Sequence, residues 1–574
     1  MALNSSNVAE VMIDTLLAAG ARRCYGIAGD TINHFTDAVR RSELDWVHVR
    51  HEEVGAFAAG AEAYMTGELA VCAGTTGPGS LHFVNGIFES HRNGAPVVLI
   101  ASNIERAETG FAFPQELDQA RIYEQCSVFC ECLSDPAQAR RLTVAAAQAA
   151  LARRGVAVLV VNGDLFTQPA VDAHAWRVVR ARPRLLPAED ELDRLADEIV
   201  RAERVCLYAG IGARAAMPAV RELAERIGAP IAHTTRAKEF AEPDNPYNVG
   251  MTGILGTPAG LYATQHCDLL IALGTDFAYT QYWPENARIA QIDVDPTHLG
   301  RRAPVDVGLV GDVGDTVAAL LPRLERSTGQ SFLEDCLERR SQDLDALADR
   351  GDEPDPTLIH PPYVAGLLDQ LAADDAVFTA DGGSPMVWML RHLTARGERR
   401  FLTSLLHGTM ANAYPQGIGI QLAYPGRQVI ALCGDGGFAM LMGDIMTLVQ
   451  YELPVKLLVF NNGSLGFVEM EQRVEGLLDA YTDLTNPDFA RLADACGVLG
   501  IGVDNAGDLE GAMSRWLAHD GPALLDVKVN RVELVMPPKL EAKQVGGSML
   551  FGIKAVFDGR FRELVEVARN NLLR

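Results

Sequence analysis

The sequence lacks any long uninterrupted hydrophobic run. No stretch approaches the roughly 18 consecutive apolar residues of a transmembrane helix. The N-terminus, MALNSSNVAEVMIDTLLAAG, also lacks the charged segment, the continuous apolar core and the cleavage site of a signal peptide. These absences predict a protein that neither spans a membrane nor carries a secretion signal.

Positive charge is scarce as well. The 574 residues include 50 Lys and Arg against 75 Asp and Glu, so the net charge is −25. Nucleic acid binding depends on a basic surface that neutralises phosphates, and we therefore expect no nucleic acid partner.

A framework of paired cysteines is missing too. The ten cysteines are scattered along the chain without any CxxC spacing. Cys126, Cys130 and Cys132 lie close together, but no matching histidine cluster accompanies them, which favours buried thiols over a metal site. Free thiols are typical of a reducing cytoplasm.

What the chain does contain is a repeated alternation of short β-rich apolar runs with Ala- and Leu-rich helical stretches. Many of the runs end in Gly, Asp, Asn or Thr, which is where ligand sites form in open α/β sheets. Eight runs indicate buried parallel strands: LAVCAGTT, PVVLIAS, VAVLVVNGD, RVCLYAG, LLIALGTD, ARIAQIDVD, QVIALCGDG and PVKLLVFNN.

Two Pro-rich or charged breaks divide this pattern. They are RARPRLLPAEDE, at about residues 180–191, and ADRGDEPDPTLIHPP, at about 348–362. The breaks predict an α/β protein with three doubly wound parallel-sheet domains. The predicted domains span residues 1–180, 190–347 and 360–535, and a C-terminal tail follows at 536–574.

One predicted strand ends in a glycine-rich turn, in the stretch CGDGGFAMLMGDIMTLVQYELPVKLLVFNN from Cys433 to Asn462. The glycines around Asp435 let the backbone approach a phosphate, and the carboxylate can bind a hard cation. FAMLMGDIMTLVQYE predicts a helix and PVKLLVF a parallel strand, so the two strand ends meet at one sheet edge. Asp435 and Asn462 can therefore share one Mg²⁺, which usually also binds phosphate oxygens.

GDG, 24 residues and then NN, with this β-α-β pattern between them, resembles the signature of the thiamine diphosphate (ThDP) enzymes that act on 2-oxo acids. The resemblance covers nearly the whole chain and is strongest to pyruvate oxidases of the quinone-reducing type, which also bind FAD. It implies Mg²⁺ ligands at Asp435, Asn462 and the backbone of Ser464. Further implied cofactor contacts are Gly408, Thr409, Gly434, Gly436, Gly437, Leu465 and Gly466.

The N-terminal part carries a second motif of this resemblance, VRHEEVGAFAAGAEAYMTG. The family alignment places its catalytic glutamate at Glu52, with Glu53 beside it. A carboxyl group on N1′ of the aminopyrimidine favours the imino tautomer, whose N4′ removes the C2 proton of the thiazolium. The turn GTTGPGSLHFVNG is of the type that holds the pyrimidine ring, with Thr75, Gly77 and Asn85 as candidates.

In LLHGTMANAYPQGIG, Met410 matches the bulky residue that bends the cofactor in this family. A methionine can equally be core filler. Since Glu52 and the metal motif lie in different domains, and the family joins them across a subunit interface, the resemblance implies a homo-oligomer, usually a tetramer.

The middle domain has a Gly-x-Gly-x-x-Ala turn after a strand, with Gly210 and Gly212, which alone is a weak dinucleotide signal. The segments VGMTGILG, LGTDFAY and IAQIDVDP resemble FAD-contacting stretches of pyruvate oxidases and acetolactate synthases. Each residue alone could simply cap a strand, and acetolactate synthases bind FAD without net electron transfer. The implied FAD contacts are Thr252, Gly253, Gly274, Thr275, Asp276, Phe277 and Asp293.

Two features favour oxidation. Simple decarboxylases of the family place an acid six residues after the metal-binding Asn, where it protonates the decarboxylated intermediate, whereas this chain has Val468 there. Phe467 resembles a residue that the oxidases place near the cofactor.

The second feature is the C-terminal tail. It is basic and has an apolar helical face, which is typical of binding at a lipid surface, although it could also pack on the protein itself.

One loop departs from the family pattern. In GFAFPQELDQARIY, Pro114 stands where a Phe is expected before Gln115, and Phe113 or Phe111 can substitute. This departure leaves a larger 2-oxo acid open as the substrate. The resemblance as a whole implies oxidative decarboxylation of pyruvate to acetate and CO₂, with electrons passed to a quinone at the inner face of the cell membrane. The alternative is an acetolactate synthase-like carboligase or acyltransferase with non-redox FAD. Phe113, Gln115 and Val468 are the expected substrate pocket.

Overall fold

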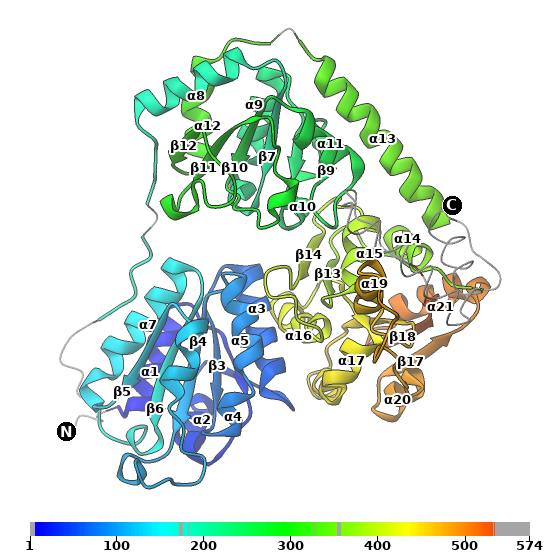
Figure 1. Ribbon diagram of the computed structural model, residues 1–574. Helices are drawn as coiled ribbons and strands as arrows, with labels where there is room; N and C mark the ends of the chain where they lie inside the picture. Colours follow the sequence, from blue (N-terminus) through cyan, green and yellow to red (C-terminus); the bar gives the residue numbers. More distant parts are fainter. Residues whose placement is uncertain are drawn as a thin grey trace.

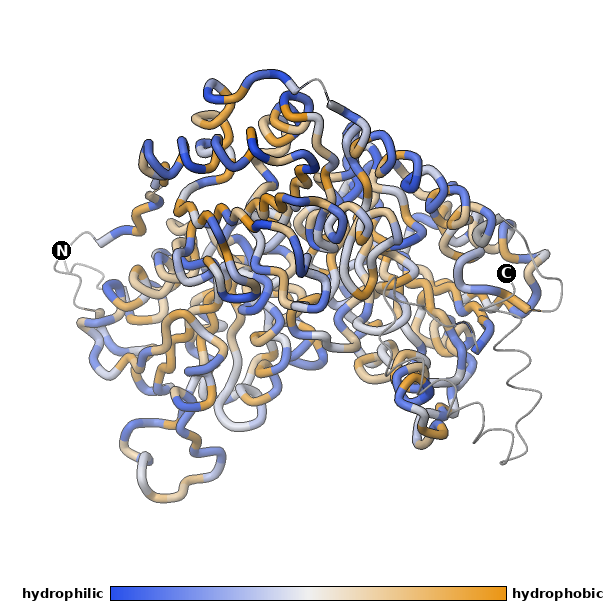
Figure 2. The backbone as a smooth tube through the Cα atoms, turned by 45° about the horizontal axis from the view of Figure 1, so that its top comes forward, coloured by the Kyte–Doolittle hydropathy of each residue, from blue (hydrophilic) through white to orange (hydrophobic). Residues whose placement is uncertain are grey.

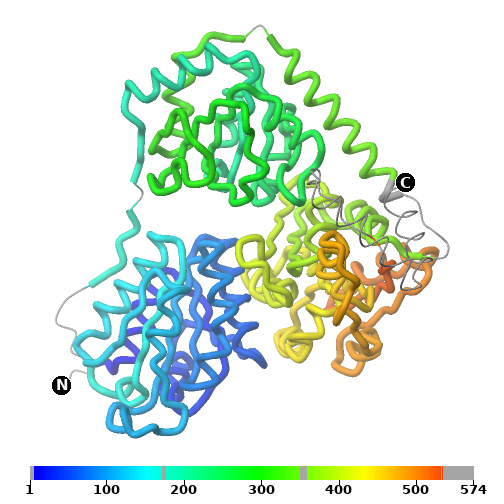
Figure 3. The backbone as a smooth tube through the Cα atoms, in the orientation of Figure 1, coloured from blue at the N-terminus to red at the C-terminus, as the bar shows by residue number. Residues whose placement is uncertain are grey.

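The computed structural model describes residues 6–170, 176–181, 183–327, 329–352, 358–531 and 533. Three α/β bodies follow one another along the chain and lie at three corners of the molecule (Figure 1). Figure 3 traces them in chain order, from the blue N-terminal domain through the green middle domain to the yellow and orange C-terminal domain. The predicted tail, 536–574, lies outside the described residues.

Each domain contains one six-stranded sheet in which all strand pairs are parallel. The strand orders are β2-β1-β3-β4-β6-β5, β12-β11-β10-β7-β8-β9 and β14-β13-β15-β16-β18-β17. In each order the chain reverses direction across the sheet, which is the doubly wound arrangement. The predicted fold class of three parallel α/β domains is therefore confirmed.

The N-terminal sheet is covered by helices on both faces. Its strands are β1 (Arg23–Gly26), β2 (Asp45–His48), β3 (Ala70–Gly74), β4 (Val97–Asn103), β5 (Phe129–Leu133) and β6 (Val156–Asn162). Its helices are α1 (Val8–Ala18), α2 (Asn33–Arg40), α3 (Glu52–Thr66), α4 (Pro78–Leu81), α5 (Val84–Arg92), α6 (Gln119–Tyr123) and α7 (Ala139–Arg153).

The middle domain repeats this plan. Its strands are β7 (Val205–Ala209), β8 (Ile231–His233), β9 (Asn248–Met251), β10 (Leu269–Leu273), β11 (Arg288–Asp293) and β12 (Val307–Val310). Its helices are α8 (Glu189–Arg201), α9 (Met217–Ile227), α10 (Lys238–Ala241), α11 (Pro258–His266), α12 (Val313–Leu320) and α13 (Ser331–Asp352).

The C-terminal domain is built in the same way. Its strands are β13 (Val377–Ala380), β14 (Arg400–Thr403), β15 (Val429–Gly434), β16 (Lys456–Asn461), β17 (Leu499–Val503) and β18 (Ala523–Lys528). Its helices are α14 (Pro361–Leu371), α15 (Ser384–His392), α16 (Ala413–Ala423), α17 (Asp435–Leu441), α18 (Ile445–Gln450), α19 (Gly466–Val474), α20 (Phe489–Ala495) and α21 (Ala506–Ala518).

All eight strands expected from the sequence are present, as β3, β4, β6, β7, β10, β11, β15 and β16. These strands occupy interior positions of their sheets and are buried almost throughout, because helices cover both of their faces. Figure 2 shows the same distribution, with hydrophobic segments inside the domains and hydrophilic residues along the outer helices. No helix among the described residues is long and apolar enough to cross a bilayer.

The helix expected between β15 and β16 differs from its prediction. It starts at Asp435 rather than Phe438, and a 3-10 turn at Met442–Asp444 divides it into α17 and α18. At this break the Asp444 carboxylate accepts the backbone N–H of Arg50 from the N-terminal domain at 2.8 Å. The break thus serves an interdomain contact that local sequence cannot show.

The N-terminal and C-terminal domains meet through α3 and α16. A Cβ added at Gly419 of α16 would lie 2.0 Å from the carbonyl oxygen of Ala58 in α3, so the two backbones touch at a position that only glycine allows. The middle domain joins through Glu239, whose carboxylate pairs with Arg214 of its own domain and with Arg400 of the C-terminal domain.

Helix α13 connects the middle domain to the C-terminal domain and packs against both (Figure 1). Its Asp335 accepts the hydroxyl of Tyr262 at 2.6 Å, and its Asp343 accepts the backbone N–H of Ala259 at 2.8 Å. Residues 348–352, the first five of the second predicted linker, belong to this helix. The first predicted linker has no regular structure in its described residues before α8 begins at Glu189.

Candidate active site

The glycine-rich turn places Asp435 at the carboxyl end of β15. The side chain is buried, 2% exposed, and its Oδ1 accepts the N–H of Gly436 at 2.8 Å. Oδ2 accepts the N–H of Gly463 at 2.7 Å and an amide hydrogen of Asn486 at 2.8 Å. Burial raises the pKa of Asp435. A carboxylate has about four acceptor positions, so one remains for a cation that would favour its charged form.

The second half of the metal motif is the turn after β16. The side-chain oxygen of Asn462 accepts the N–H of Ser464 at 3.1 Å, which folds this turn over the end of the strand. The preceding Asn461 faces inward and donates to Asp526 at 2.9 Å. Asn462 is therefore the member of the NN pair that is left at the sheet edge, next to Asp435.

A cavity of about 360 Å³ opens at this edge. All the residues that line it lie between 361 and 533, in the C-terminal domain. Gly383, with φ 124°, and Gly408, with φ 74°, have no atoms within 4 Å of the position that a Cβ would take. Helix α15 begins at Ser384, so its free N–H groups lie at this wall, where they can bind an anionic group such as a diphosphate.

Asp381, which no sequence motif singled out, organises the same edge from the end of β13. Its Oδ1 accepts the N–H of Ala413 at 2.9 Å, and its Oδ2 accepts the N–H of Gly434 at 3.1 Å. Burial raises the pKa of Asp381 to about 7. A Cβ at Gly437 would lie 2.2 Å from Oδ2, so this glycine is required by the close approach of the carboxyl group.

The loop that carries Gly408, Thr409 and Met410 lies against the same turns. The carbonyl oxygen of Thr409 accepts the N–H of Gly382 at 3.0 Å. The methyl group of Met410 lies 3.2 Å from the position of a Cβ at Gly436. Met410 therefore lies over the turn at Asp435 and lines the cavity. Its role in shaping a bound cofactor stays a prediction.

Helix α19 forms another wall of the cavity through Gly466, Phe467, Val468 and Glu471. Glu471 lies one helical turn after Phe467 and Val468 and so faces the same way, and burial raises its pKa. Glu469 points elsewhere, because it is buried and pairs with Arg473 and Arg531. The helix thus supplies an acid at position 471 that the sequence analysis did not consider.

Glu52 begins helix α3 in the N-terminal domain and is buried, 6% exposed. Its Oε2 lies 2.9 Å from Nδ1 of His82, a residue that sequence motifs did not single out. A Cβ at Gly79 would lie 3.3 Å from Oε1, so this oxygen faces the turn that begins with Gly74. Glu52 does not line the cavity of the C-terminal domain.

Only some of the residues predicted to hold the pyrimidine ring lie close together. Gly77 contacts Gln115, since a Cβ at Gly77 would lie 2.7 Å from the Cβ of Gln115. Thr75 is held by Asp30, whose carboxylate accepts its hydroxyl at 2.9 Å. Asn85 instead bridges two domains, because its amide donates to Glu53 at 2.6 Å and to Thr409 at 3.0 Å.

The departing loop is exposed. Phe111 is 78% exposed and Phe113 40% exposed, and the Glu116 carboxylate accepts the backbone N–H groups of Gly110 and Phe113. Pro114 sits between Phe113 and Gln115, and Gln115 adopts a positive φ of 70°. The loop therefore has its own internal hydrogen bonds and brings Gln115, but not an apolar cluster, to the turn at Gly77.

In the middle domain, the predicted nucleotide residues cluster at the carboxyl ends of β7, β10 and β11. The N–H of Gly212 donates to Gly274 at 3.0 Å, and Cβ atoms at Gly210 or Gly274 would collide with the opposite turn. These glycines therefore let two strand-end turns touch. That packing requirement is independent of any phosphate.

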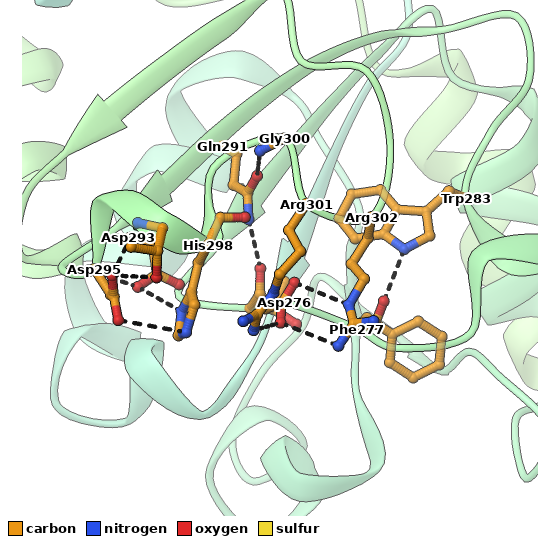
Figure 4. Close-up of polar contacts among 12 residues, drawn as sticks. Asp276, Phe277, Trp283, Gln291, Asp293, Asp295, His298, Gly300, Arg301 and Arg302 are labelled. Atoms are coloured by element: carbon orange, nitrogen blue, oxygen red, sulfur yellow. Dashed lines mark hydrogen bonds and ion pairs between the residues drawn. The ribbon is translucent and has the colours of Figure 1, made fainter.

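Figure 4 shows the acidic residues of this cluster and their partners. Asp276 pairs with Arg301 and Arg302. Asp293 is buried, and its Oδ1 accepts the N–H of Asp295 at 3.0 Å and lies 3.2 Å from Nδ1 of His298. These contacts use one oxygen of Asp293; an acid at a strand end commonly binds ribose hydroxyls in dinucleotide sites, so this role of Asp293 stays a prediction.

Two further observations fit a bound nucleotide cofactor. The hydroxyl of Thr252 is buried without a hydrogen-bond partner in the described residues, which is costly unless a ligand supplies one. Gly253 has φ 103°, and a Cβ there would lie 2.6 Å from the ring of Phe277. Among the predicted FAD residues, Thr252, Gly253 and Phe277 therefore form one contact group.

Comparison with known proteins agrees with this division into parts. Models described as thiamine pyrophosphate enzyme match as the N-terminal TPP binding domain over residues 6–122, the central domain over 192–320 and the C-terminal TPP binding domain over 381–527. The chain is 35% identical over 98% of both chains to YdaP of Bacillus subtilis (strain 168), a provisionally named thiamine pyrophosphate-containing protein.

Two further relatives carry names of defined enzymes. The pyruvate oxidase of Lactiplantibacillus plantarum is 31% identical over 90% of this chain and 88% of its own. The large subunit of acetolactate synthase isozyme 2 from Escherichia coli (strain K12) is 29% identical over 92% of this chain and 97% of its own. The similarities to an oxidase and to a synthase are therefore of equal strength.

Proposed function

The chain belongs to the thiamine pyrophosphate enzyme family, and on this premise we propose that it is a ThDP- and FAD-dependent oxidase that converts pyruvate to acetate and CO₂ and passes the electrons to a quinone. ThDP is the cofactor that the two matched TPP binding domains support. Mg²⁺, FAD, the oxidative reaction and the acceptor are parts of the proposal.

The observation that best supports an oxidative reaction is the apolar composition of the cavity wall formed by α19. Phe467 and Val468 present apolar side chains to the cavity at the position where a protonating acid would end the reaction as a simple decarboxylation. Without an acid at 468, the electron pair left by CO₂ stays available for transfer to a flavin. Glu471 lies a turn further along, and we assign it to orientation of the 2-oxo acid.

When bound, ThDP supplies an electron sink for the electron pair released as a 2-oxo acid loses CO₂. Asp435, Asn462 and the backbone of Ser464 would hold Mg²⁺ at the edge of the cavity, and the N-terminus of α15 would face the diphosphate. Met410 would support the bent form of the cofactor. Glu52 would hydrogen-bond N1′ of the aminopyrimidine and hold the proton at N1′ that favours the imino tautomer.

FAD would bind at the strand ends of the middle domain. Among the described residues, the hydroxyl of Thr252 has no hydrogen-bond partner, and the contacts of Asp293 use only its Oδ1; together with the ring of Phe277, these observations support this placement. An acidic side chain that accepts two hydroxyls of a ribose is a common feature of dinucleotide sites.

The deciding experiment is an anaerobic absorbance measurement on protein loaded with ThDP, Mg²⁺ and FAD. Pyruvate should bleach the oxidised flavin band, and acetate should form when a quinone analogue reoxidises the flavin. Consumption of pyruvate without bleaching would contradict the oxidase proposal. A matched sample of the Glu52→Gln variant should bind flavin but show no bleaching.

The loop around Pro114 favours a second candidate, a carboligase related to the acetolactate synthases. Phe111 and Phe113 are exposed rather than packed into an apolar pocket, which leaves room beside Gln115 for a second 2-oxo acid. Formation of acetolactate in the same anaerobic experiment, with the flavin still oxidised, would establish this reaction instead.

The proposal includes a homo-oligomer. The cavity is lined only by the C-terminal domain, and Glu52 lies outside it, so a second copy would bring its N-terminal domain to the cofactor. A tetramer is the assembly we expect. We also propose peripheral association with the inner face of the membrane through residues 536–574, which lie outside the described residues; sedimentation with lipid vesicles of the full chain, compared with a chain ending at 535, tests it.

A further inference from the structure

His82 and Glu52 form a hydrogen-bonded pair in the N-terminal domain. Nδ1 of His82 lies 2.9 Å from Oε2 of Glu52. The two residues differ sharply in access to water, because Glu52 is 6% exposed whereas the side chain of His82 is 47% exposed. The pair thus connects a buried carboxyl group to a half-exposed imidazole ring.

A second histidine fixes the ring of His82. The rings of His51 and His82 stack with centroids 4.6 Å apart and an interplanar angle of 22°. His51 is itself anchored as the N-cap of α3, where its Nδ1 accepts the N–H of Glu53 at 3.3 Å. The charged groups that face this pair are Glu52 on His82, the Glu53 carboxylate, 3.9 Å from His51, and the carboxylate of Asp444 from the C-terminal domain, which also interacts with His51.

The two oxygens of Glu52 have separate surroundings. Oε2 is occupied by His82, while Oε1 faces the turn at Gly79. If Glu52 serves the aminopyrimidine, as the proposed function states, Oε1 is the oxygen available to it. A carboxyl group in this position must gain and lose a proton in each catalytic cycle, yet its burial keeps it from direct exchange with solvent.

We propose that His82 is a positioning residue that holds Glu52 and relays protons between this carboxyl group and water. This proposal rests on the proposed role of Glu52, but not on the oxidative reaction, FAD or the quinone. A proton that leaves Oε2 is accepted at Nδ1 of His82, and the resulting imidazolium releases a proton to water. The reverse transfer restores the carboxyl group, and no electron changes hands.

The proposal is tested by hydrogen–deuterium exchange at C2 of bound ThDP, measured by acid quench and proton NMR without any 2-oxo acid. His82→Ala should slow the exchange by at least about tenfold, the lower range for general acid–base groups. Added imidazole should restore much of the rate, since the exposed position leaves space for a small base. Calorimetric titration with ThDP and Mg²⁺ should show affinity within about threefold of wild type.

Two variants distinguish a proton relay through His82 from a purely structural role of this residue. His82→Gln keeps a hydrogen-bond donor for Glu52 but cannot relay a proton, and it should remain slow; His34→Gln, at an exposed histidine of α2, should behave as wild type. Wild-type exchange in His82→Gln or His82→Ala, or a slow His82→Ala that imidazole does not restore, would overturn the relay. Loss of ThDP binding in the His82 variants would also overturn it, by assigning His82 to cofactor binding. Failure of wild-type protein to bind ThDP would instead refute the proposed function.

Discussion

The carboxylate of Asp435 accepts the backbone N–H of Gly463 at 2.7 Å, across 28 positions of sequence. This bond ties the turn after β15 to the turn after β16, so that Asp435 and Asn462 are neighbours before any cation arrives. The metal ligands that we propose are thus pre-organised by the protein, and the entropic cost of assembling them is met during folding.

If the cofactor lies between two copies, inactive chains should complement each other. Chains with Glu52→Gln lack one half of the site, and chains with Asp435→Ala lack the other. In a mixed pair, one of the two sites contains both intact residues. Random pairing of equal amounts therefore predicts about one quarter of wild-type activity.

The measurement is pyruvate turnover after co-expression of the two variants with different affinity tags. Each variant expressed alone should be inactive and serves as the control. The two tags verify that mixed assemblies form; an inactive mixture that contains them would then show that Glu52 and Asp435 act within one chain.

Glu471 is expected to donate a hydrogen bond to the substrate carboxylate. Because partial desolvation raises the pKa of Glu471, its neutral form persists to higher pH than in a fully solvated glutamate. Glu471→Ala should lower kcat/KM for pyruvate by about 10- to 100-fold, the effect of losing one hydrogen bond to a charged group. Glu471→Gln should retain most activity and lose the decline that accompanies ionisation of Glu471 as pH rises.

The pH profile of kcat/KM for the three proteins checks this prediction. In wild type the decline should follow ionisation of Glu471, since the carboxylate cannot donate. Glu510→Gln, at an exposed position of α21, is the matched control. Equal profiles for wild type and Glu471→Gln would exclude the assigned role.

The raised pKa of Asp381 predicts that the stability of the cofactor-free protein depends on pH. Its pKa is raised by burial from 3.8 to about 7, so between these values the folded state holds a proton that the unfolded state has lost. Stability from this group is therefore present at low pH and is lost as pH rises towards 7. Linkage gives a loss of about 1.4 kcal/mol between pH 6 and pH 8.

Urea unfolding of wild type and Asp381→Asn at pH 6, 7 and 8 measures this loss. The variant has no titrating group at 381, so the stability of wild type relative to the variant should fall across this range. The range also stays above the sequence pI of about 4.9, where a net charge near zero favours association of proteins. A difference independent of pH would show that Asp381 is already ionised in the fold.

Adding a single methyl group at the contact between α3 and α16 should destabilise the protein. In Gly419→Ala the new Cβ would lie 2.0 Å from the carbonyl oxygen of Ala58, so the helices must separate. We expect a loss of about 1–3 kcal/mol, the usual range for overpacking. Gly511→Ala, in α21 with nothing within 4 Å of its Cβ, should be neutral or slightly stabilising.

Thermal unfolding monitored by circular dichroism distinguishes the two variants. Gly419→Ala should lower the midpoint, while Gly511→Ala should leave it unchanged or raise it. Equal midpoints would mean that the domains move apart at little cost.

The central strands were predictable because covered parallel strands are nearly continuous runs of apolar residues, as in QVIALCGDG and PVKLLVFNN. The approach of Asp435 to the turn at Asn462 was predictable because strand ends of a β-α-β unit share one edge. Asp381 was not, since only the strand order that sets β13 beside β15 brings it to Gly434. Contacts of this kind depend on topology rather than on spacing.

Other misses have similar causes. Glu471 becomes a cavity residue only once α19 is known to be helical, because it then faces the same way as Phe467. His82 follows a short helix, where no motif marks it, and its proposed role depends on its contact with Glu52, 30 residues earlier. Residues 348–352 look like a linker from their charge and nearby prolines, yet they continue helix α13.

The two connections of the middle domain set different limits on how relatives of this chain can diverge in length. A 22-residue helix is about 33 Å long, and one inserted residue would turn everything beyond it by about 100° and advance it by about 1.5 Å. The irregular segment before α8 has no such periodicity and can absorb an extra residue locally. Insertions and deletions among relatives should therefore accumulate before residue 189 and be rare between residues 331 and 352.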